Sequence, residues 1–417
     1  LREHTKFAGF SLTLFTNFGF TIRDAQSFSL NWKLLGMTDE GGCRRMKSTV
    51  LLNDFKAQWR HVRKDALQAV DQVGQSGWFI LGEEVARFEQ QLAAYAGKQY
   101  AIGCASGLDA IELGLQILGC QGKPVITTPL SAFATTLAIV RAGGVPIFID
   151  TDESGLLDLN KVEAFLESKC EKEHLLVPVH LFGHSLNLQK LQQLRERFRL
   201  RVLEDCAQAI GANSNGKKIG AASDLAALSF YPTKNLGCMG DGGAVITDSE
   251  ESATLARALR DYGQTGKYRH TYLGMNSRLD EIHAAILTYA LLPRASEFTE
   301  RRREIAGFYR SHIVSEKLQI PPEPHGSDSV YHLFPILIQG DRESFQEHLR
   351  TQGIQSAVHY PILIPDQSAL GGQPFIVEGD LTNARGFAAR EVSLPIHPYM
   401  SDDDVQRVVA ACNTWQQ

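Results

Sequence analysis

The chain alternates between helical and strand-like hydrophobic patterns over most of its length. Apolar residues recur at helical spacing after Asp54, at positions 55, 59, 62, 67 and 70, which predicts an amphipathic first helix. A second helix is predicted from about Glu83 to Tyr95, because apolar residues follow one face and Gly97 stands where a C-terminal cap is expected.

Short apolar runs alternate with helical segments between residues 100 and 250. The runs that predict strands are 100–104, 125–128, 146–150, 174–180, 201–204, 225–231 and 243–247. The segments that predict helices are 109–118, 132–142 and 188–198. This alternation is typical of βαβ units, so we predict an α/β fold with a mainly parallel central sheet.

The pattern changes after a long predicted helical stretch, residues 277–309. Prolines at 321, 322 and 324 then form a stiff connector before a predicted strand at 331–338 and predicted helices at 344–352 and 402–412. We therefore predict a large domain over residues 47–290 and a smaller C-terminal α+β domain over residues 291–417.

Residues 1–46 form a separate N-terminal segment. Polar residues interrupt its apolar stretch, no small-residue cleavage site follows, and Met46 begins a stretch that reads like an ordinary start. We expect an extension without a catalytic role, disordered or arising from an upstream start assignment. A targeting peptide is the alternative.

Composition and charge exclude several classes of protein. The net charge of −5 gives no reason to expect a nucleic-acid partner or an anionic membrane surface. No apolar run reaches the roughly 18 residues of a transmembrane helix. The seven cysteines are scattered without metal-ligand spacing, which indicates reduced thiols in the cytoplasm and no metal site.

A lysine follows one of the predicted buried strands in the segment SFYPTKNLG. Burial lowers the pKa of an amine, and an uncharged amine at Lys234 can condense with an aldehyde. A structural or exposed lysine is the simpler interpretation of this position when it is taken alone.

A carboxylate follows another predicted strand in the segment VLEDCAQ. Ligand sites of parallel sheets gather at the carboxyl ends of the strands, where Asp205 stands. Pyridoxal phosphate needs a protonated ring nitrogen, which an aspartate can hold, and Gln208 is close enough in sequence to reach the ring hydroxyl. Helix capping is the alternative role for Asp205.

A phosphate site is predicted where the segment CASGLD opens a helix. Backbone amides at a helix N-terminus attract phosphate, and Gly107 after Ser106 permits close approach. Ser229 could add a hydroxyl. Phe133 could stack on the pyridine ring, although a plain core position is the alternative.

These segments together resemble the DegT/StrS family of nucleotide-sugar aminotransferases, which are pyridoxal phosphate enzymes of fold type I. The resemblance covers about residues 50–417. Its motifs here are SGWFILGEEVARFEQQLAAYAG, ASGLDAIEL, EDCAQAIGA, SFYPTKNLG followed by GDGGAVITD, GMNSRLDEIHAAIL, VHYP and SLPIHPYM.

The resemblance implies a role for each matched residue. Lys234 would hold the cofactor as a Schiff base and Asp205 would pair with its ring nitrogen, with Gln208 beside it. Phe133 would stack on the ring. The residues implied at the phosphate are Ser106, Gly107, Ser229 and, across the interface of a homodimer with shared active sites, the partner's Asn276.

The resemblance also implies a reaction. L-glutamate would supply the amino group, and a nucleotide-linked keto sugar would receive it, giving an amino-deoxy sugar for a surface polysaccharide or a glycosylated metabolite. The GLDA segment together with TKNLG favours the branch that aminates dTDP-3-keto-6-deoxy sugars. A 4-keto sugar or a cyclitol is the alternative substrate.

Two departures from the family pattern affect the site. Leu108 stands where many family members have a threonine whose hydroxyl contacts the phosphate. Family members also often have a histidine shortly after the YP pair, which is Tyr360 and Pro361 here, and this chain has none there. For the substrate we consider three loops. Their candidate residues are His180, Lys267, Tyr268, His270 and Tyr360.

Three other functions are alternatives for this sequence. A pyridoxal-dependent sugar dehydratase would carry histidine in place of Lys234. A nicotinamide oxidoreductase would need a G-x-G-x-x-G between a strand and a helix, which is absent. A non-catalytic regulator could keep the fold, but the full set of site residues argues against it.

Overall fold

A computed structural model of the chain describes residues 49–169 and 173–416. They belong to one compact unit, Ser48–Gln417. The expectation for residues 1–46 lies outside the described residues.

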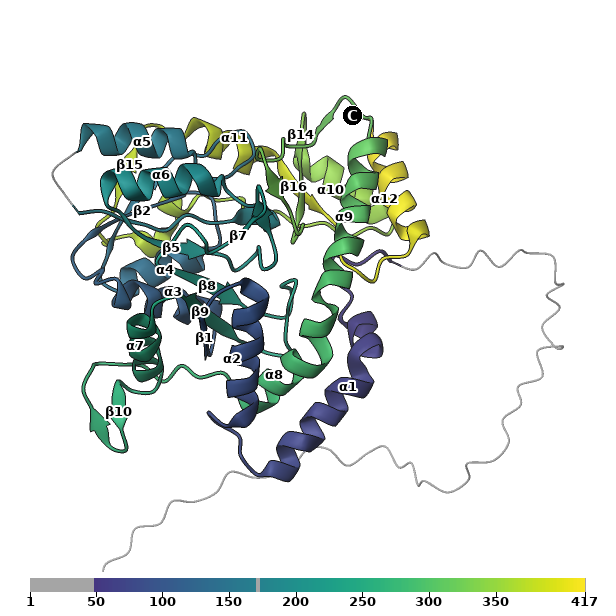
Figure 1. The fold of residues 1–417 in the computed structure, drawn as a ribbon. Coiled ribbons are helices and arrows are strands. Elements are labelled where there is room, and N and C mark those ends of the chain that lie inside the picture. The colour runs from purple at the N-terminus through teal and green to yellow at the C-terminus, as the bar shows by residue number, and fades with distance from the viewer. Residues whose placement is uncertain (1–48, 170–172, 417) are drawn as a thin grey trace, which may run out of the picture. The chain divides into compact units, whose positions relative to one another are not determined.

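An eight-stranded mixed sheet forms the centre of this unit (Figure 1). In spatial order its strands are β1 (Tyr100–Cys104), β9 (Gly243–Thr247), β8 (Leu225–Ser229), β5 (Arg201–Asp205), β4 (Leu175–Leu176), β2 (Pro124–Thr127), β3 (Val145–Ile149) and β15 (Ile376–Glu378). Strand β9 runs antiparallel to both neighbours, β1 and β8, and the other pairs are parallel. The predicted α/β fold with a mainly parallel sheet is confirmed.

Helices cover both faces of this sheet. They are α1 (Phe55–Ser76), α2 (Glu83–Ala96), α3 (Gly107–Ile117), α4 (Phe133–Arg141), α5 (Leu159–Ser168), α6 (Leu188–Phe198), α7 (Glu250–Arg260) and α8 (Glu281–Ile286). Side chains of a strand alternate between faces. Accordingly Val125 and Leu203 pack with α3 and α4, while Ile126 and Val202 pack with α5 and α6 on the other face. Helices α1, α2 and α8 cover β8 and β9 on that second face.

The C-terminal part builds a second core around a three-stranded sheet. Its strands, in spatial order, are β12 (Leu318–Gln319), β14 (Phe334–Ile338) and β16 (Glu391–Leu394). Its helices are α9 (Ala295–His312), α10 (Arg342–Thr351) and α12 (Asp402–Thr414). The predicted helical stretch 277–309 is interrupted by a π turn, Leu287–Leu291, and by a short turn, Leu292–Arg294, that contains Pro293.

Part of the C-terminal region returns to the large sheet. Strand β15 pairs with β3, and α11 (Thr382–Arg390) packs its Phe387 against Phe182. Neither contact is evident from the hydrophobic pattern of the sequence. The domain boundary near residue 290 stays a proposal, and these two elements cross it.

Two small sheets lie on the periphery. One consists of β13 (Ser327–Asp328), β6 (Asn213–Ser214) and β7 (Lys217–Lys218), and the other is the hairpin of β10 (Gln264–Gly266) and β11 (Arg269–His270).

Two further observations concern the chain as a whole. Within residues 49–169 and 173–416, no helix combines the length and the apolar character that crossing a membrane requires. The cysteines that the structure describes as free are all buried, namely Cys104, Cys120, Cys206, Cys238 and Cys412.

Candidate active site

The candidate residues meet at one edge of the large sheet. Strand β1 is parallel to β8, because both are antiparallel to β9, so the carboxyl ends of β1, β2, β5 and β8 lie at the same edge. Asp205 is the last residue of β5, and Ser106, Phe133 and Lys234 follow the ends of β1, β2 and β8. This is the position at which α/β sheets bind ligands.

Lys234 lies in a tight loop after β8. Its backbone N–H donates to Tyr231 O at 2.8 Å, and Cys238 N–H closes the loop by donating to Phe230 O at 2.8 Å. Gly237 is required here, because a Cβ atom would lie 2.3 Å from Pro232 O. Burial lowers the pKa of the Lys234 amine to about 8, although the nearby Asp205 raises it. An amine with this pKa is partly uncharged near neutral pH, as a nucleophile must be.

Asp205 is buried at the end of β5, and its charge interacts with that of Lys234. Burial raises the pKa of its carboxyl, although hydrogen bonds and the charge of Lys234 act in the opposite direction. The hydroxyl of Thr135 on α4 donates to Oδ2 at 2.8 Å, and Ala207 N–H donates to Oδ1 at 3.1 Å. Thr135, two residues after Phe133, was not among the predicted site residues.

The turn between β1 and α3 packs directly against the start of β9 and the end of β8. A Cβ atom at Gly107 would lie 2.6 Å from the Cβ of Ser229, and one at Gly243 would lie 2.3 Å from Ser106 O. The Ser106 hydroxyl caps α3 by accepting from Asp109 N–H at 3.1 Å. The N–H groups of Gly107 and Leu108 belong to the first turn, which has no intrahelical partners, so they can bind an anion.

Gln208 and Tyr360 meet beside Asp205. The amide of Gln208 donates to the Tyr360 hydroxyl at 3.2 Å and accepts from Phe182 N–H at 2.7 Å. The structure therefore places Tyr360 at the candidate cofactor pocket. Phe133 is partly buried and packs toward Phe148 and its neighbours, so stacking on a cofactor ring remains a proposal.

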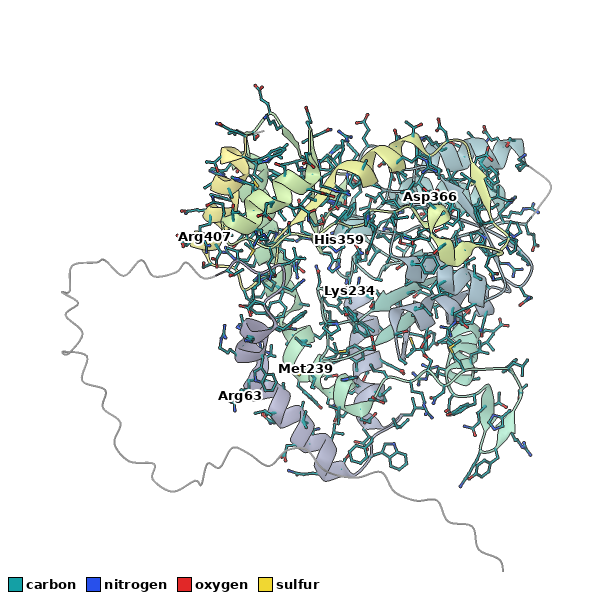
Figure 2. The ribbon with its side chains drawn as sticks, turned by 180° about the vertical axis from the view of Figure 1, so that it is seen from behind. Arg63, Lys234, Met239, His359, Asp366 and Arg407 are labelled. Atoms are coloured by element: carbon teal, nitrogen blue, oxygen red, sulfur yellow. The ribbon has the colours of Figure 1, made fainter. Side chains whose placement is uncertain are left out.

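Two histidines near Lys234 were not among the predicted site residues. Figure 2 shows Lys234 and His359 close together at the centre of the molecule, and the charge of Lys234 helps to lower the pKa of the His359 ring to about 4, after burial. His332 is buried as well, and burial followed by Lys234 lowers its pKa. The VHYP motif, which contains His359, was the only signal for it in the sequence.

The set of residues fits pyridoxal phosphate. An amine whose pKa is lowered stands opposite a buried carboxylate, and a helix N-terminus with a glycine at the point of closest approach provides an anion cradle. These are the groups that the cofactor's aldehyde, ring nitrogen and phosphate need.

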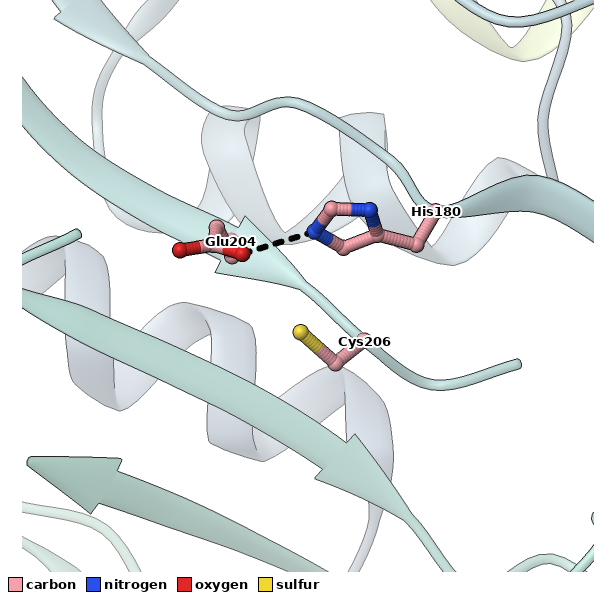
Figure 3. A group of neighbouring side chains, drawn as sticks. All are labelled: His180, Glu204 and Cys206. Atoms are coloured by element: carbon pink, nitrogen blue, oxygen red, sulfur yellow. Dashed lines mark hydrogen bonds and ion pairs between the residues drawn. The ribbon is translucent and has the colours of Figure 1, made fainter. Parts of the chain in front are cut away.

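Figure 3 shows the side chain of His180 pointing toward Glu204, the residue before Asp205 in β5. Its ring is fully buried, its Nε2 is 2.8 Å from Glu204 Oε2, and its Nδ1 accepts from Leu186 N–H at 3.1 Å. The prediction of a substrate contact at His180 is therefore wrong, because both ring nitrogens are already engaged inside the protein.

The same histidine belongs to a group that resembles a metal site in composition. His180, Glu204 and Cys206 place one donor atom each within 4.8 Å of one another. However, Glu204 also accepts from Gly220 N–H at 2.8 Å and from Ala222 N–H at 3.1 Å. The carboxylate therefore serves as a hydrogen-bond hub that fixes β5, and with it the adjacent Asp205.

The remaining predicted residues lie away from Lys234 of the same chain. Lys267, Tyr268 and His270 are exposed on the β10–β11 hairpin, which projects from the body of the protein next to α7 (Figure 1). Asn276 is exposed beside this hairpin and pairs with Asp261 through its backbone. Among the described residues, the side chains of Lys267, Tyr268 and His270 make no hydrogen bond to the site, whereas Ser277, next to Asn276, accepts from Ala105 N–H at 3.1 Å beside the Ser106–Gly107 turn.

Comparison with known proteins agrees with this geometry. A pleiotropic regulatory protein of Geobacillus stearothermophilus is 38% identical over 364 residues, which cover 85% of this chain and 95% of the relative. A dTDP-3-amino-3,4,6-trideoxy-alpha-D-glucose transaminase of Streptomyces venezuelae is 37% identical over 368 residues, which cover 87% of this chain and 95% of the relative.

A solved structure shows the same fold. The crystal structure of S. venezuelae DesV in complex with a ketimine intermediate superimposes with a TM-score of 0.84 at 37% identity, covering 88% of this chain and 98% of that one. Enzymes of this kind use pyridoxal phosphate, have fold type I and aminate sugars. Residues 60–413 match the DegT/DnrJ/EryC1/StrS aminotransferase family, and the chain belongs to that family of pyridoxal phosphate-dependent sugar aminotransferases.

Proposed function

We infer that this enzyme transfers the amino group of L-glutamate to a dTDP-linked 3-keto-6-deoxy sugar. The observation that carries the proposal is the charge interaction between the buried Lys234 and the buried Asp205, at the sheet edge that also carries the Ser106–Gly107 turn. The S. venezuelae relative, named for a dTDP-3-amino sugar, supports the nucleotide and the position of the amine. Other relatives are named for UDP-linked sugars, so the sugar and its nucleotide are part of the proposal.

Each residue of the site has a defined task in this reaction. Pyridoxal phosphate, when bound, supplies an aldehyde to carry the amino group and a ring that withdraws electrons. Lys234 would hold the cofactor and, once released from it, would take the proton from the α-carbon of the donor. Asp205, held by Thr135, would keep the ring nitrogen protonated. Ser106, Gly107 and Ser229 would hold the phosphate.

A homodimer with shared active sites is part of the proposal. Large apolar side chains are exposed in two neighbouring segments, with Leu273 99% and Trp78 60% exposed. The Trp78 segment is joined to the start of α8, eight residues after Leu273, because Glu281 N–H donates to Phe79 O at 3.0 Å. An exposed apolar surface of this kind marks an interface. This surface adjoins Asn276 and the β10–β11 hairpin. In the proposed dimer, Asn276 and the hairpin of one copy would lie near the active site of the other copy.

In the dimer, the hairpin would meet the nucleotide of the substrate. Lys267 and His270 offer positive charge or hydrogen bonds to a diphosphate, and Tyr268, 82% exposed, offers a ring. Tyr360, from the same chain as Lys234, would contact the sugar.

The test is a substrate panel with glutamate as the donor. The purified enzyme would be given a keto-cyclitol and 3-keto and 4-keto sugars, the sugars each linked to dTDP or UDP, and the formation of 2-oxoglutarate would be followed. We expect the highest kcat/KM with the dTDP-linked 3-keto sugar. A preference for a 4-keto sugar, for a UDP sugar or for a cyclitol would replace the proposed substrate, and no transfer from glutamate to any of them would contradict the proposed function.

A further inference from the structure

The segment that leads into the SLPIHPYM motif lies behind the candidate active site, and the proposed function gives it no role. It begins in β16, where Glu391 and Ser393 are both 0% exposed. Backbone hydrogen bonds join Ser393 and Ala357 in both directions, at 2.8 and 3.4 Å. This pairing fixes the segment that continues into His359 beside β16.

Side chains join the same two segments. The Ser393 hydroxyl donates to Glu391 Oε1 at 2.5 Å, and its oxygen lies 2.9 Å from His359 Nδ1. The second oxygen of Glu391, Oε2, accepts from the backbone N–H of His359 at 2.6 Å. A continuous chain of hydrogen bonds therefore runs from the carboxyl through the hydroxyl to the imidazole. Among the described residues, no hydrogen bond engages the far nitrogen, Nε2.

The carboxyl at the inner end of this chain changes charge near neutral pH. Burial raises the pKa of Glu391 to about 8, although the bonds from Ser393 and from the backbone of His359, and the charge of Arg342 on α10, lower it. Tyr360, which also faces Glu391, has its pKa raised to about 12, chiefly by burial, and stays neutral.

The imidazole at the outer end stays uncharged. Burial and then Lys234 lower the pKa of His359 to about 4. His332, which faces the same ring, also stays neutral because burial, Lys234, Arg302 and His359 lower its pKa. Because the ring stays neutral, one nitrogen of His359 can accept a proton only if the other nitrogen loses its proton at the same time.

We propose that His359, Ser393 and Glu391 form a proton relay for the amino group that reacts at Lys234. When Glu391 is ionised, Ser393 donates to it, His359 Nδ1–H donates to Ser393, and Nε2 has a free lone pair. When Glu391 is protonated, the bonds reverse: Glu391 donates to Ser393, Ser393 donates to Nδ1, and Nε2 carries the proton.

The relay links these two states in one balanced step, and this step rests on the proposed function because it starts at the amino donor. The ammonium group of the donor loses a proton to His359 Nε2. The Nδ1 proton moves to Ser393 Oγ, and the hydroxyl proton of Ser393 moves to Glu391 Oε1. The donor becomes a neutral, nucleophilic amine, Glu391 becomes neutral, and the imidazole is neutral before and after.

The first test observes the histidine directly and does not depend on turnover. Nitrogen-15 NMR of the pyridoxal phosphate-loaded protein, with labelled histidine, reports which ring nitrogen carries the proton, and His359→Gln identifies the signal. We expect the proton on Nε2 below about pH 8 and on Nδ1 above it. Glu391→Gln should fix it on Nε2 at every pH, because the amide can donate to Ser393 but cannot ionise.

The second test measures the amino-group transfer from glutamate in a single turnover. Glu391→Gln should slow it by on the order of 10²-fold, the usual effect of losing an acid–base partner. Glu112→Gln is the matched control, because Glu112 is a buried carboxylate of α3 that pairs with Arg141 at 2.8 Å and lies outside the relay. It should leave the rate unchanged. If Glu391→Gln does not fold, Ser393→Ala interrupts the same chain and must show the same loss.

The outcomes separate the relay from the proposed function. A tautomer that does not change with pH, or a change that survives in Glu391→Gln, would overturn the relay. A wild-type protein whose tautomer changes but which accepts no amino group from glutamate would contradict the proposed function instead.

Discussion

The chemistry of the site depends on the environments of two side chains, Lys234 and Asp205. Burial alone would favour the neutral form of both. Their mutual attraction opposes this, and Thr135 and Ala207 N–H add two hydrogen bonds to the carboxylate. A positively charged ring nitrogen brought to Asp205 by the cofactor would add a further partner for the same carboxylate.

Capture of the cofactor should therefore depend on pH in a defined direction. Only uncharged Lys234 can attack an aldehyde, and its pKa is lowered to about 8, so the rate at which cofactor-free protein binds pyridoxal phosphate should rise as the pH rises through about 8. Asp205 raises this pKa, so in Asp205→Asn the same rise should occur at lower pH. Stopped-flow absorbance would measure both profiles.

The control for this experiment is Asp224→Asn, which removes an acidic group paired with Arg195 just before β8, at the opposite end of that strand from Lys234. Its profile should match that of the wild type. An Asp205→Asn profile that stays in place would show that Asp205 and Lys234 do not interact.

Among the structural elements, α2 shows how distant segments support the site. Its N-terminal residue is preceded by Gly82, which has no side chain for capping. Instead Glu281, at the start of α8, accepts from the N–H groups of Gly82, Glu84 and Val85 at 2.7, 2.9 and 3.0 Å. A carboxylate at a helix N-terminus also interacts favourably with the helix dipole.

Loss of this cap should destabilise the protein measurably. We expect Glu281→Ala to reduce the free energy of unfolding by about 2 kcal/mol, because it leaves three N–H groups without a partner in a largely buried position. Denaturant titration followed by circular dichroism would measure the change. Glu250→Ala is the control, since Glu250 is an exposed residue in the first turn of α7. Equal stabilities of the two variants would contradict the capping role.

At the scale of the whole molecule, much of the fold could be predicted from hydrophobic periodicity. The predicted strands 100–104 and 243–247 and the predicted helix 188–198 coincide with β1, β9 and α6. The antiparallel direction of β9 could not be predicted, because an apolar run has the same pattern in either orientation. Strand β15 was missed, because its three residues are exposed at the edge of the sheet and show no alternation.

The site could be predicted in part, for related reasons. Four site residues could be predicted because they stand at or just after the carboxyl ends of strands that share one edge of the sheet. They are Lys234, Asp205, Ser106 and Ser229. The bond between Ser393 and His359 joins residues 34 positions apart through pairing that no local pattern reveals. The prediction at His180 was wrong because a polar residue at the end of a predicted strand was expected to be exposed. Its actual burial depends on the loops that pack over it.

The proposed dimer makes a prediction about a single exposed side chain. Leu273→Asp should place a charge in an apolar interface and raise the dimer dissociation constant by on the order of 10²-fold or more. Sedimentation velocity would show monomers at concentrations where the wild type is dimeric. If Asn276 acts on the partner's cofactor, dissociation should also weaken cofactor binding.

The control here is Val314→Asp, which changes an exposed apolar residue just after α9, outside the two apolar segments. It should leave the association state unchanged. A wild-type protein that is monomeric at all concentrations would contradict the shared active site.

The most direct test of the account is to find which residue carries the cofactor. The enzyme loaded with pyridoxal phosphate would be reduced with borohydride, digested and analysed by mass spectrometry. We predict a phosphopyridoxyl group on the peptide that contains Lys234, and no such group in Lys234→Ala. A label on a different lysine, or a cofactor that remains covalently attached in Lys234→Ala, would contradict the account.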